Sequence, residues 1–210
     1  MVGRFLARER VAPPVHCPGG AGVVDCERIG SPAKTAMELL LSREQIAEAV
    51  ARIGGQITND FQGESVVLVG VLKGACLFLS DLARQIELDA TFDFIAVRSY
   101  GASRQSAGEV QLIKDVTTPL HNQNVVLVED ILDTGLTLTF LRKLLLAHQP
   151  RAFKIAALLD KPSRRVVPVQ ADYVGFKIPD KFVVGYGLDL NERYRNLPDI
   201  CVLPEDLMEK

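Results

Sequence analysis

The stretch that decides the fold runs from Val125 to Thr137 and reads VVLVEDILDTGLT. It begins with four apolar residues, three of them β-branched, which is typical of a strand covered on both faces of a sheet. Two acids follow, and then a turn of small and hydroxylated residues that opens an apolar helix. In an open parallel sheet, ligands bind beyond the carboxyl ends of the strands. We therefore expect a ligand site at this turn.

The turn contains the residue types that a phosphate group needs. Thr134, Gly135 and Thr137 fall where the free backbone N–H groups of a helix N-terminus point outward, an arrangement that binds a dianion without a lysine. The neighbouring carboxylates of Glu129 and Asp130 repel each other and need a cation or hydroxyl donors, which a sugar diol chelated to Mg²⁺ supplies. Solvated acids before an ordinary helix cap are the alternative. Acids, glycine and threonines all fall in register after an apolar strand, which favours the phosphate site.

From Met37 onward, strand and helix patterns alternate. Besides the strand at 125–128, apolar runs predict strands at 66–72, 92–99, 110–116, 155–159 and 173–178. Helical spacing predicts helices at 77–86 and 138–147, and a further helix that begins at a capping box over residues 42–45 and extends through Ile57. Crossover connections of this kind predict an α/β fold with a mainly parallel sheet.

Residues 1–36 have a different composition from the rest of the chain. They hold five Gly and four Pro and show neither strand nor helix periodicity. We expect a flexible N-terminal extension over 1–36, followed by one domain over 37–210. A second interpretation is that the natural protein starts at Met37.

The overall composition argues against several classes of protein. Hydrophobic residues make up 48% of the 210 residues, and 24 basic against 26 acidic side chains give a net charge of −2. We therefore expect a globular protein that binds no nucleic acid. No apolar run reaches the roughly 18 residues that a membrane span needs, so we expect no membrane partner. Four cysteines form no CxxC pair, which disfavours zinc. Cys76 and Cys201 lie in apolar surroundings and are expected as buried reduced thiols, which indicates the cytoplasm.

A second candidate ligand loop follows the first apolar strand. Residues 71–75 read VLKGA, and Lys73 together with the N–H groups of Gly74 and Ala75 suits a pyrophosphate. The GxxxxGK[ST] spacing of a P-loop is missing. An ordinary strand-to-helix turn with a surface lysine is an equally good interpretation of this segment alone.

Two segments near the C-terminus have the chemistry of a base pocket. Lys161 follows a strand, and residues 180–189 read DKFVVGYGLD. A lysine offers only donors, so it fits a carbonyl oxygen and favours a 6-oxopurine over adenine. Phe182 offers a flat apolar face for stacking. Taken singly, Lys161 is more typical of a solvated surface and Phe182 of a core.

Together these segments resemble the type I phosphoribosyltransferases, and within them the hypoxanthine-guanine branch. The resemblance covers about residues 39–203. It implies the type I fold, a mainly parallel sheet flanked by helices with a small hood subdomain for the base. It implies purine salvage, in which hypoxanthine or guanine reacts with 5-phosphoribosyl-1-pyrophosphate (PRPP) to give IMP or GMP and pyrophosphate. Mg²⁺ as cofactor and a homo-oligomer, a dimer or tetramer, are implied as well.

The resemblance also assigns roles to individual residues. Glu129 and Asp130 contact the ribose and, with Asp189, hold the metal, while Asp133 is the catalytic acid or base at purine N7. The PRPP phosphates lie on Asp133, Thr134, Gly135, Leu136 (through its backbone), Thr137, Lys73, Gly74 and Arg195, with Ser99 and Tyr100 opening a lid. The base is held by Lys161 at O6, by Phe182 through stacking and by the Val183 backbone. Arg193 is an alternative to Arg195, and a cis peptide is expected at Leu72–Lys73.

The sequence argues against three other functions. A regulatory protein that binds PRPP on the same fold and contacts nucleic acid is disfavoured by the net charge, and it would have no use for a base pocket. A transferase for adenine or a pyrimidine is disfavoured by the donor at Lys161. A Rossmann dehydrogenase requires a GxGxxG after a strand, which is missing.

Overall fold

The computed structural model describes residues 15–16, 22–24, 37–100 and 109–208. Its main sheet has seven strands in the order β1-β9-β8-β7-β4-β5-β6. These are β1 (Val15–His16), β4 (Val66–Leu72), β5 (Ala90–Tyr100), β6 (Glu109–Lys114), β7 (Asn124–Leu132), β8 (Ala152–Asp160) and β9 (Tyr173–Lys177). Neighbouring strands are parallel except β5 and β6, which confirms the expected mainly parallel sheet.

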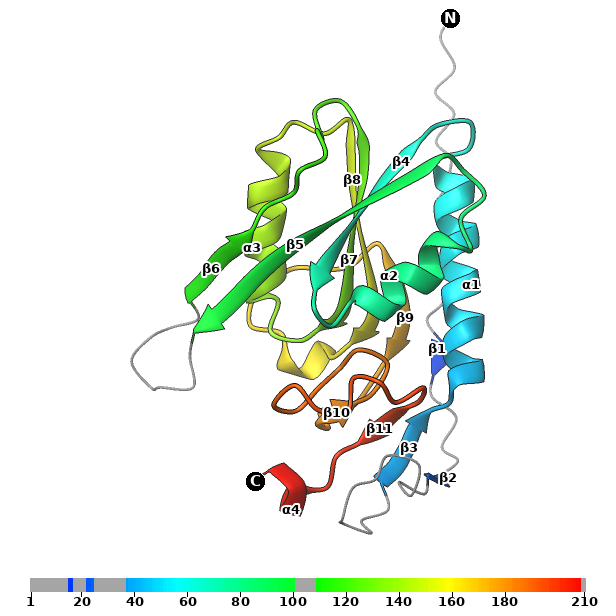
Figure 1. Ribbon diagram of the computed structural model, residues 1–210, viewed down its shortest axis with the longest axis vertical. Helices are drawn as coiled ribbons and strands as arrows, with labels where there is room; N and C mark the ends of the chain where they lie inside the picture. The colour runs from blue at the N-terminus through cyan, green and yellow to red at the C-terminus, as the bar shows by residue number, and fades with distance from the viewer. Residues whose placement is uncertain (1–14, 17–21, 25–36, 101–108, 209–210) are drawn as a thin grey trace, which may run out of the picture.

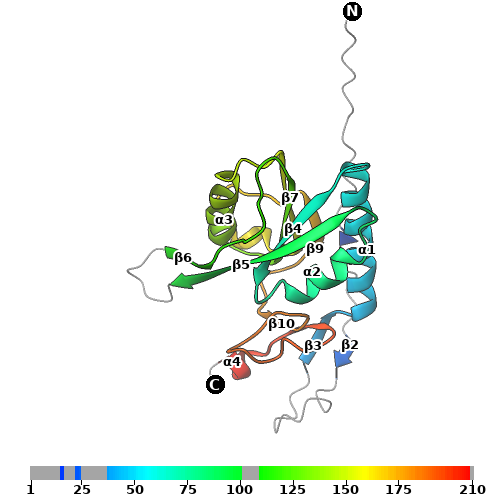
Figure 2. The ribbon, with the colours of Figure 1, turned by 45° about the horizontal axis from the view of Figure 1, so that its top comes forward.

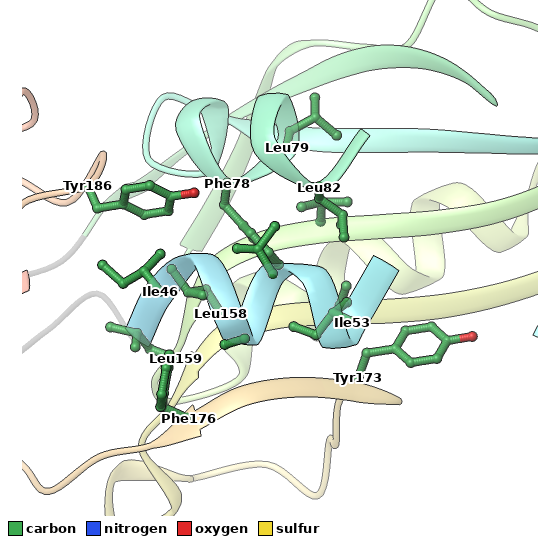
Figure 3. Close-up of a cluster of buried hydrophobic side chains, with 14 of the residues drawn as sticks. Ile46, Ile53, Phe78, Leu79, Leu82, Leu158, Leu159, Tyr173, Phe176 and Tyr186 are labelled. Atoms are coloured by element: carbon green, nitrogen blue, oxygen red, sulfur yellow. The ribbon is translucent and has the colours of Figure 1, made fainter. Parts of the chain in front are cut away.

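Helices cover both faces of this sheet (Figure 1). α1 (Arg43–Asp60) and α2 (Cys76–Ala83) pack on one face, and α3 (Leu136–Leu146) packs on the other. α1 begins at the predicted capping box, in which the Gln45 N–H donates to the Ser42 hydroxyl and the Gln45 side chain accepts from the Ser42 N–H. Figure 3 shows Phe78 and Leu82 of α2 between that helix and α1.

A smaller sheet lies beside the N-terminal end of α1 (Figure 2). Its order is β10-β11-β3-β2. The strands are β2 (Gly22–Val24), β3 (Met37–Leu41), β10 (Val183–Val184) and β11 (Ile200–Val202), and a short helix α4 (Glu205–Met208) follows. This sheet corresponds to the expected hood. β1 and β2 fall within residues 1–36, where no strand was predicted.

Several predicted boundaries are wrong for identifiable reasons. β7 does not end at Val128, because Glu129, Ile131 and Leu132 continue to pair with β8. The two acids therefore occupy positions within the strand. The polar stretch from Tyr100 to Gly108 is predicted from sequence as a loop, but Tyr100 still belongs to β5 and pairs with Glu109. The rest of that loop, residues 101–108, lies outside the described residues.

Two further expectations concern thiols and membranes. Cys201 is buried, but Cys76 is only half-buried at the start of α2, contrary to the prediction. Cys17 and Cys26 lie outside the described residues. Among the helices that the structure describes, none is both long enough and apolar enough to cross a bilayer.

Candidate functional site

A cleft of about 780 Å³ separates the turn after β7 from the small sheet. It brings together six of the residues predicted from sequence, although they come from three different segments of the chain. These are Asp130, Asp133, Lys161, Phe182, Val183 and Asp189. The proposed base pocket and the proposed acid or base thus line one space.

The turn after β7 is built for close backbone approach. Gly135 caps α3 with φ +85°, a left-handed conformation that favours glycine. A Cβ at this position would lie 2.5 Å from the Val169 side chain. Thr134 accepts from the Leu136 N–H at 3.4 Å, and Thr137 lies in the first turn of α3. The helix N-terminus therefore points its free N–H groups out of the turn.

Arg165 and Val166, which the sequence did not single out, hold this turn by hydrogen bonds. The Arg165 guanidinium donates to the Asp133 carbonyl and pairs with the Asp160 carboxylate. The Val166 N–H donates to the Thr134 carbonyl at 3.0 Å. The segment that follows β8 thus holds the turn after β7 in place.

Of the two acids of β7, Glu129 is buried and Asp130 is half-buried. Glu129 is 8% exposed, and its Oε2 has no hydrogen-bond partner among the described residues. Burial, and then the neighbouring Asp130, raise the pKa of Glu129 well above its usual value. Burial also raises the pKa of Asp130 to about 6, although this carboxyl accepts from the Ile131 N–H at 2.8 Å. Such carboxylates fit a cation or hydroxyl donors supplied by a ligand.

Three segments of chain meet beside Asp130 at glycines. The Leu72–Lys73 peptide is cis, as the resemblance implies. A Cβ on Gly74 would lie 1.7 Å from Oδ2 of Asp130, and a Cβ on Gly187 would lie 2.1 Å from the Gly74 carbonyl oxygen. Only glycines allow β7, the loop after β4 and the turn at Gly187 to approach so closely.

Lys73 and Arg195 lie in one ion-pair cluster. The Lys73 ammonium is 3.0 Å from Oε2 of Glu192, and Arg195 is 3.3 Å from the same oxygen. Arg195 also pairs with Asp189 at 2.8 Å and donates to the Gly187 carbonyl at 2.6 Å. Arg193, the alternative, instead lies over the Tyr194 ring. Glu192 is a further residue that the sequence analysis missed.

The predicted three-acid metal set does not assemble. Across the described part of the chain, no three His, Cys, Asp or Glu side chains are grouped to hold a metal ion. Asp189 is engaged by Arg195 and accepts from the Glu192 N–H.

The part of the cleft proposed to hold the base contains a buried lysine, Lys161, and an exposed aromatic ring, Phe182. Lys161 is 7% exposed, and burial lowers the pKa of its ammonium group. Phe182 is 40% exposed, so its ring is not part of the core. Asp133 faces this side and is held by Arg164, whose Nε is 3.1 Å from Oδ1. Arg164 was missed, and its neighbours in sequence give no sign that it reaches Asp133.

Ser99 and Tyr100 were expected to open a lid. Both residues lie at the end of β5, paired with Val110 and Glu109. Their backbone positions are described, but the expected lid residues beyond them are not.

Comparison with known proteins identifies the family. A family model described as "Phosphoribosyl transferase domain" matches residues 37–191. The chain belongs to this family. Hypoxanthine-guanine phosphoribosyltransferase of Staphylococcus aureus (strain Mu50 / ATCC 700699) is 46% identical over 170 residues, which cover 81% of this chain and 95% of that protein. The protein of the same name from Bacillus subtilis (strain 168) is 45% identical over 172 residues, 82% of this chain and 96% of its own.

Solved structures agree with this assignment. A hypoxanthine phosphoribosyltransferase from Staphylococcus aureus superposes with a TM-score of 0.78 at 46% identity, covering 81% of this chain and 92% of the other. A Trypanosoma cruzi hypoxanthine phosphoribosyltransferase variant, in a ternary substrates complex, gives 0.76 at 36% identity and covers 82% and 97%. The expected type I phosphoribosyltransferase fold is confirmed.

The buried carboxylate of Glu129 is expected to lower the free energy of unfolding at neutral pH, where it must carry a charge. Because the folded-state pKa is raised above the usual 4.5, the folded chain binds more protons than the unfolded chain, and stability falls as pH rises from there. We expect Glu129→Gln to raise the free energy of unfolding at pH 8 by about 1–3 kcal/mol. The gain should shrink as the pH is lowered toward 4.5.

Urea unfolding of the ligand-free protein at several pH values measures this effect. Glu87→Gln, at an exposed glutamate, serves as the control and should leave stability unchanged. A Glu129→Gln protein that is no more stable than the parent at pH 8 would show that the buried carboxylate carries no penalty.

Proposed function

We propose that this chain is a hypoxanthine-guanine phosphoribosyltransferase of purine salvage, with the activity carried by residues 37–210. The observation that carries the proposal is the cleft itself. A buried lysine, an exposed phenylalanine ring and Asp133 line one space beside a helix N-terminus suited to a phosphate. The names of the relatives support the same reaction. By the same similarity we propose a cytoplasmic homo-oligomer, a dimer or tetramer.

PRPP would lie across the three loops that meet at the cleft. The backbone N–H groups of residues 134–137 would hold the 5′-phosphate. Glu129 and Asp130 would accept from the two ribose hydroxyls, which would satisfy Oε2 of Glu129, an oxygen without a partner among the described residues. Lys73, the Gly74 N–H and Arg195 would bind the pyrophosphate, with Ser99 and Tyr100 covering it.

The acids also fit a divalent cation. Asp130 and Asp189 line the same cleft and offer hard oxygen donors, which Mg²⁺ prefers. With Glu129 they would hold the ion only together with substrate oxygens, because the described residues form no complete ligand group on their own. When bound, Mg²⁺ supplies positive charge that stabilises the leaving pyrophosphate.

The proposed reaction exchanges one bond at C1′ of the ribose. The bond to pyrophosphate breaks as the bond to purine N9 forms, through a sugar with oxocarbenium character. Lys73 and Arg195 stabilise the negative charge that develops on the pyrophosphate. Asp133 accepts the proton from N7 of the purine, while Lys161 donates to O6 and holds the base in register. Phe182 stacks on the ring, and the Val183 backbone meets the N1/N2 edge.

A base panel tests the proposed function. Pyrophosphate release from PRPP is measured with hypoxanthine, guanine, xanthine, adenine and uracil offered separately. We expect turnover with 6-oxopurines and none with adenine or uracil. Binding of PRPP without turnover of any base would favour the regulatory alternative.

Lys161→Met tests the base contact directly. Loss of a charged donor to O6 is expected to raise KM for hypoxanthine about 10- to 100-fold, while PRPP binding stays within a few-fold. Lys181→Met is the matched control, because Lys181 lines the same cleft but is paired with Glu38 at 2.9 Å. An equal change in both variants would remove the specific role of Lys161.

A further inference from the structure

The carboxylate of Glu192 lies between the two cations proposed to bind pyrophosphate. Its Oε2 is 3.0 Å from Nζ of Lys73 and 3.3 Å from both Nε and Nη2 of Arg195. One oxygen therefore accepts from both residues at once. A phosphoryl oxygen of a bound pyrophosphate would need the same donors.

The backbone around Glu192 directs its side chain to this position. Asn191 and Glu192 both have positive φ, 51° and 65°, which is uncommon for residues other than glycine. The turn is closed by paired backbone hydrogen bonds between Leu190 and Arg193, and the Glu192 N–H donates to Asp189 at 2.8 Å. These hydrogen bonds fix the turn that carries Glu192.

We propose that Glu192 is an internal competitor for pyrophosphate. It neutralises Lys73 and Arg195 when the site holds no anion, it is displaced when PRPP binds, and its return promotes release of the pyrophosphate product. This inference rests on the proposed function, since it needs these two cations to be the pyrophosphate site.

The ion pair between Lys73 and Glu192 is weak enough for pyrophosphate to replace the carboxylate. The side chains of Lys73 and Glu192 are 65% and 62% exposed, so their ion pair is weak and screened by solvent. Pyrophosphate carries several negative charges against one on the carboxylate, and therefore it wins the competition. Asp189 is a different case, because it holds the less exposed Arg195 at 2.8 Å and keeps that guanidinium oriented after Glu192 has left.

Glu192→Gln removes the charge and keeps the shape of the side chain. We expect the dissociation constant of magnesium pyrophosphate, measured by titration calorimetry, to fall about three- to tenfold in the variant. The product-inhibition constant of pyrophosphate should fall in parallel, and pyrophosphate should dissociate more slowly. The difference from the parent protein should shrink at high salt. KM for hypoxanthine should stay within twofold.

Glu44→Gln is the matched control, because Glu44 forms an ion pair of similar exposure with Arg43 outside the site. It should leave pyrophosphate binding unchanged. Glu192→Asp, which keeps the charge on a shorter side chain, should fall between the parent and Glu192→Gln.

Two results would distinguish the competitor role of Glu192 from the proposed function. Pyrophosphate binding by the parent protein, with equal or weaker binding by Glu192→Gln, overturns the competitor role and leaves the site intact. No binding of magnesium pyrophosphate by the parent or by any variant overturns the proposed function itself.

Discussion

Asp133→Asn is expected to lower the rate of nucleotide formation by about 10²- to 10⁴-fold while PRPP binding changes by less than a few-fold. Asparagine has nearly the same shape as aspartate and still offers an oxygen to Arg164, which lies 3.1 Å from Oδ1 in this structure. It cannot accept a proton from the purine. Single-turnover rates with hypoxanthine, together with PRPP titration, measure the two effects separately.

Asp180→Asn is the appropriate control for this experiment. Asp180 lines the same cleft and faces the same Arg164, at 3.8 Å, but the proposed reaction gives it no proton to accept. Its loss is expected to slow turnover less than about tenfold. Equal losses of rate and PRPP affinity in Asp133→Asn would mean that Asp133 binds substrate and is not the base.

Gly74→Ala is expected to raise KM for PRPP about 100-fold or more, the second large effect. The added methyl group would lie 1.7 Å from Oδ2 of Asp130, far inside any allowed contact, so either the loop or the carboxylate must move. Both belong to the proposed PRPP site, and a displacement near 1 Å at such a site costs about 10²-fold. Steady-state kinetics with varied PRPP measures the change.

Gly55→Ala provides the matched glycine substitution. Gly55 lies in α1, and a Cβ there meets nothing within 4 Å. Alanine is the better helix former, so this variant should keep its activity and gain about 1 kcal/mol of stability. If Gly74→Ala retained the parent KM, the close approach to Asp130 would have no part in PRPP binding.

The core of the fold was predictable because its signals are local. The capping box at Ser42, the apolar run of β4 and the apolar start of β7 each specify an element within a few residues. The resemblance implied the hood, but the sequence pattern did not predict its strands β10 and β11, because two and three residues are too few for any period to show. Such strands are defined by their partners and not by their own sequences.

The site divides in the same way. Residues whose chemistry follows from their place at the end of a strand, such as Asp133 and Lys161, were predicted and do line the cleft. Arg164, Arg165 and Glu192 were not, because the site contacts that matter join them to Asp133, 31 and 32 positions away, and to Lys73, 119 positions away. A single sequence shows that these residues are charged but not which charge they will meet.

A Cβ on Gly187 would lie 2.1 Å from the Gly74 carbonyl oxygen, so the chain at Gly187 and the loop after β4 approach each other very closely. The first glycine belongs to the same segment as Phe182, and the second to the loop proposed to hold the leaving group. Neither of these two segments can move toward the other without a steric clash. Substitutions that change base selectivity are therefore expected to change the rate of pyrophosphate release as well. Base selectivity and turnover would have to be optimised together.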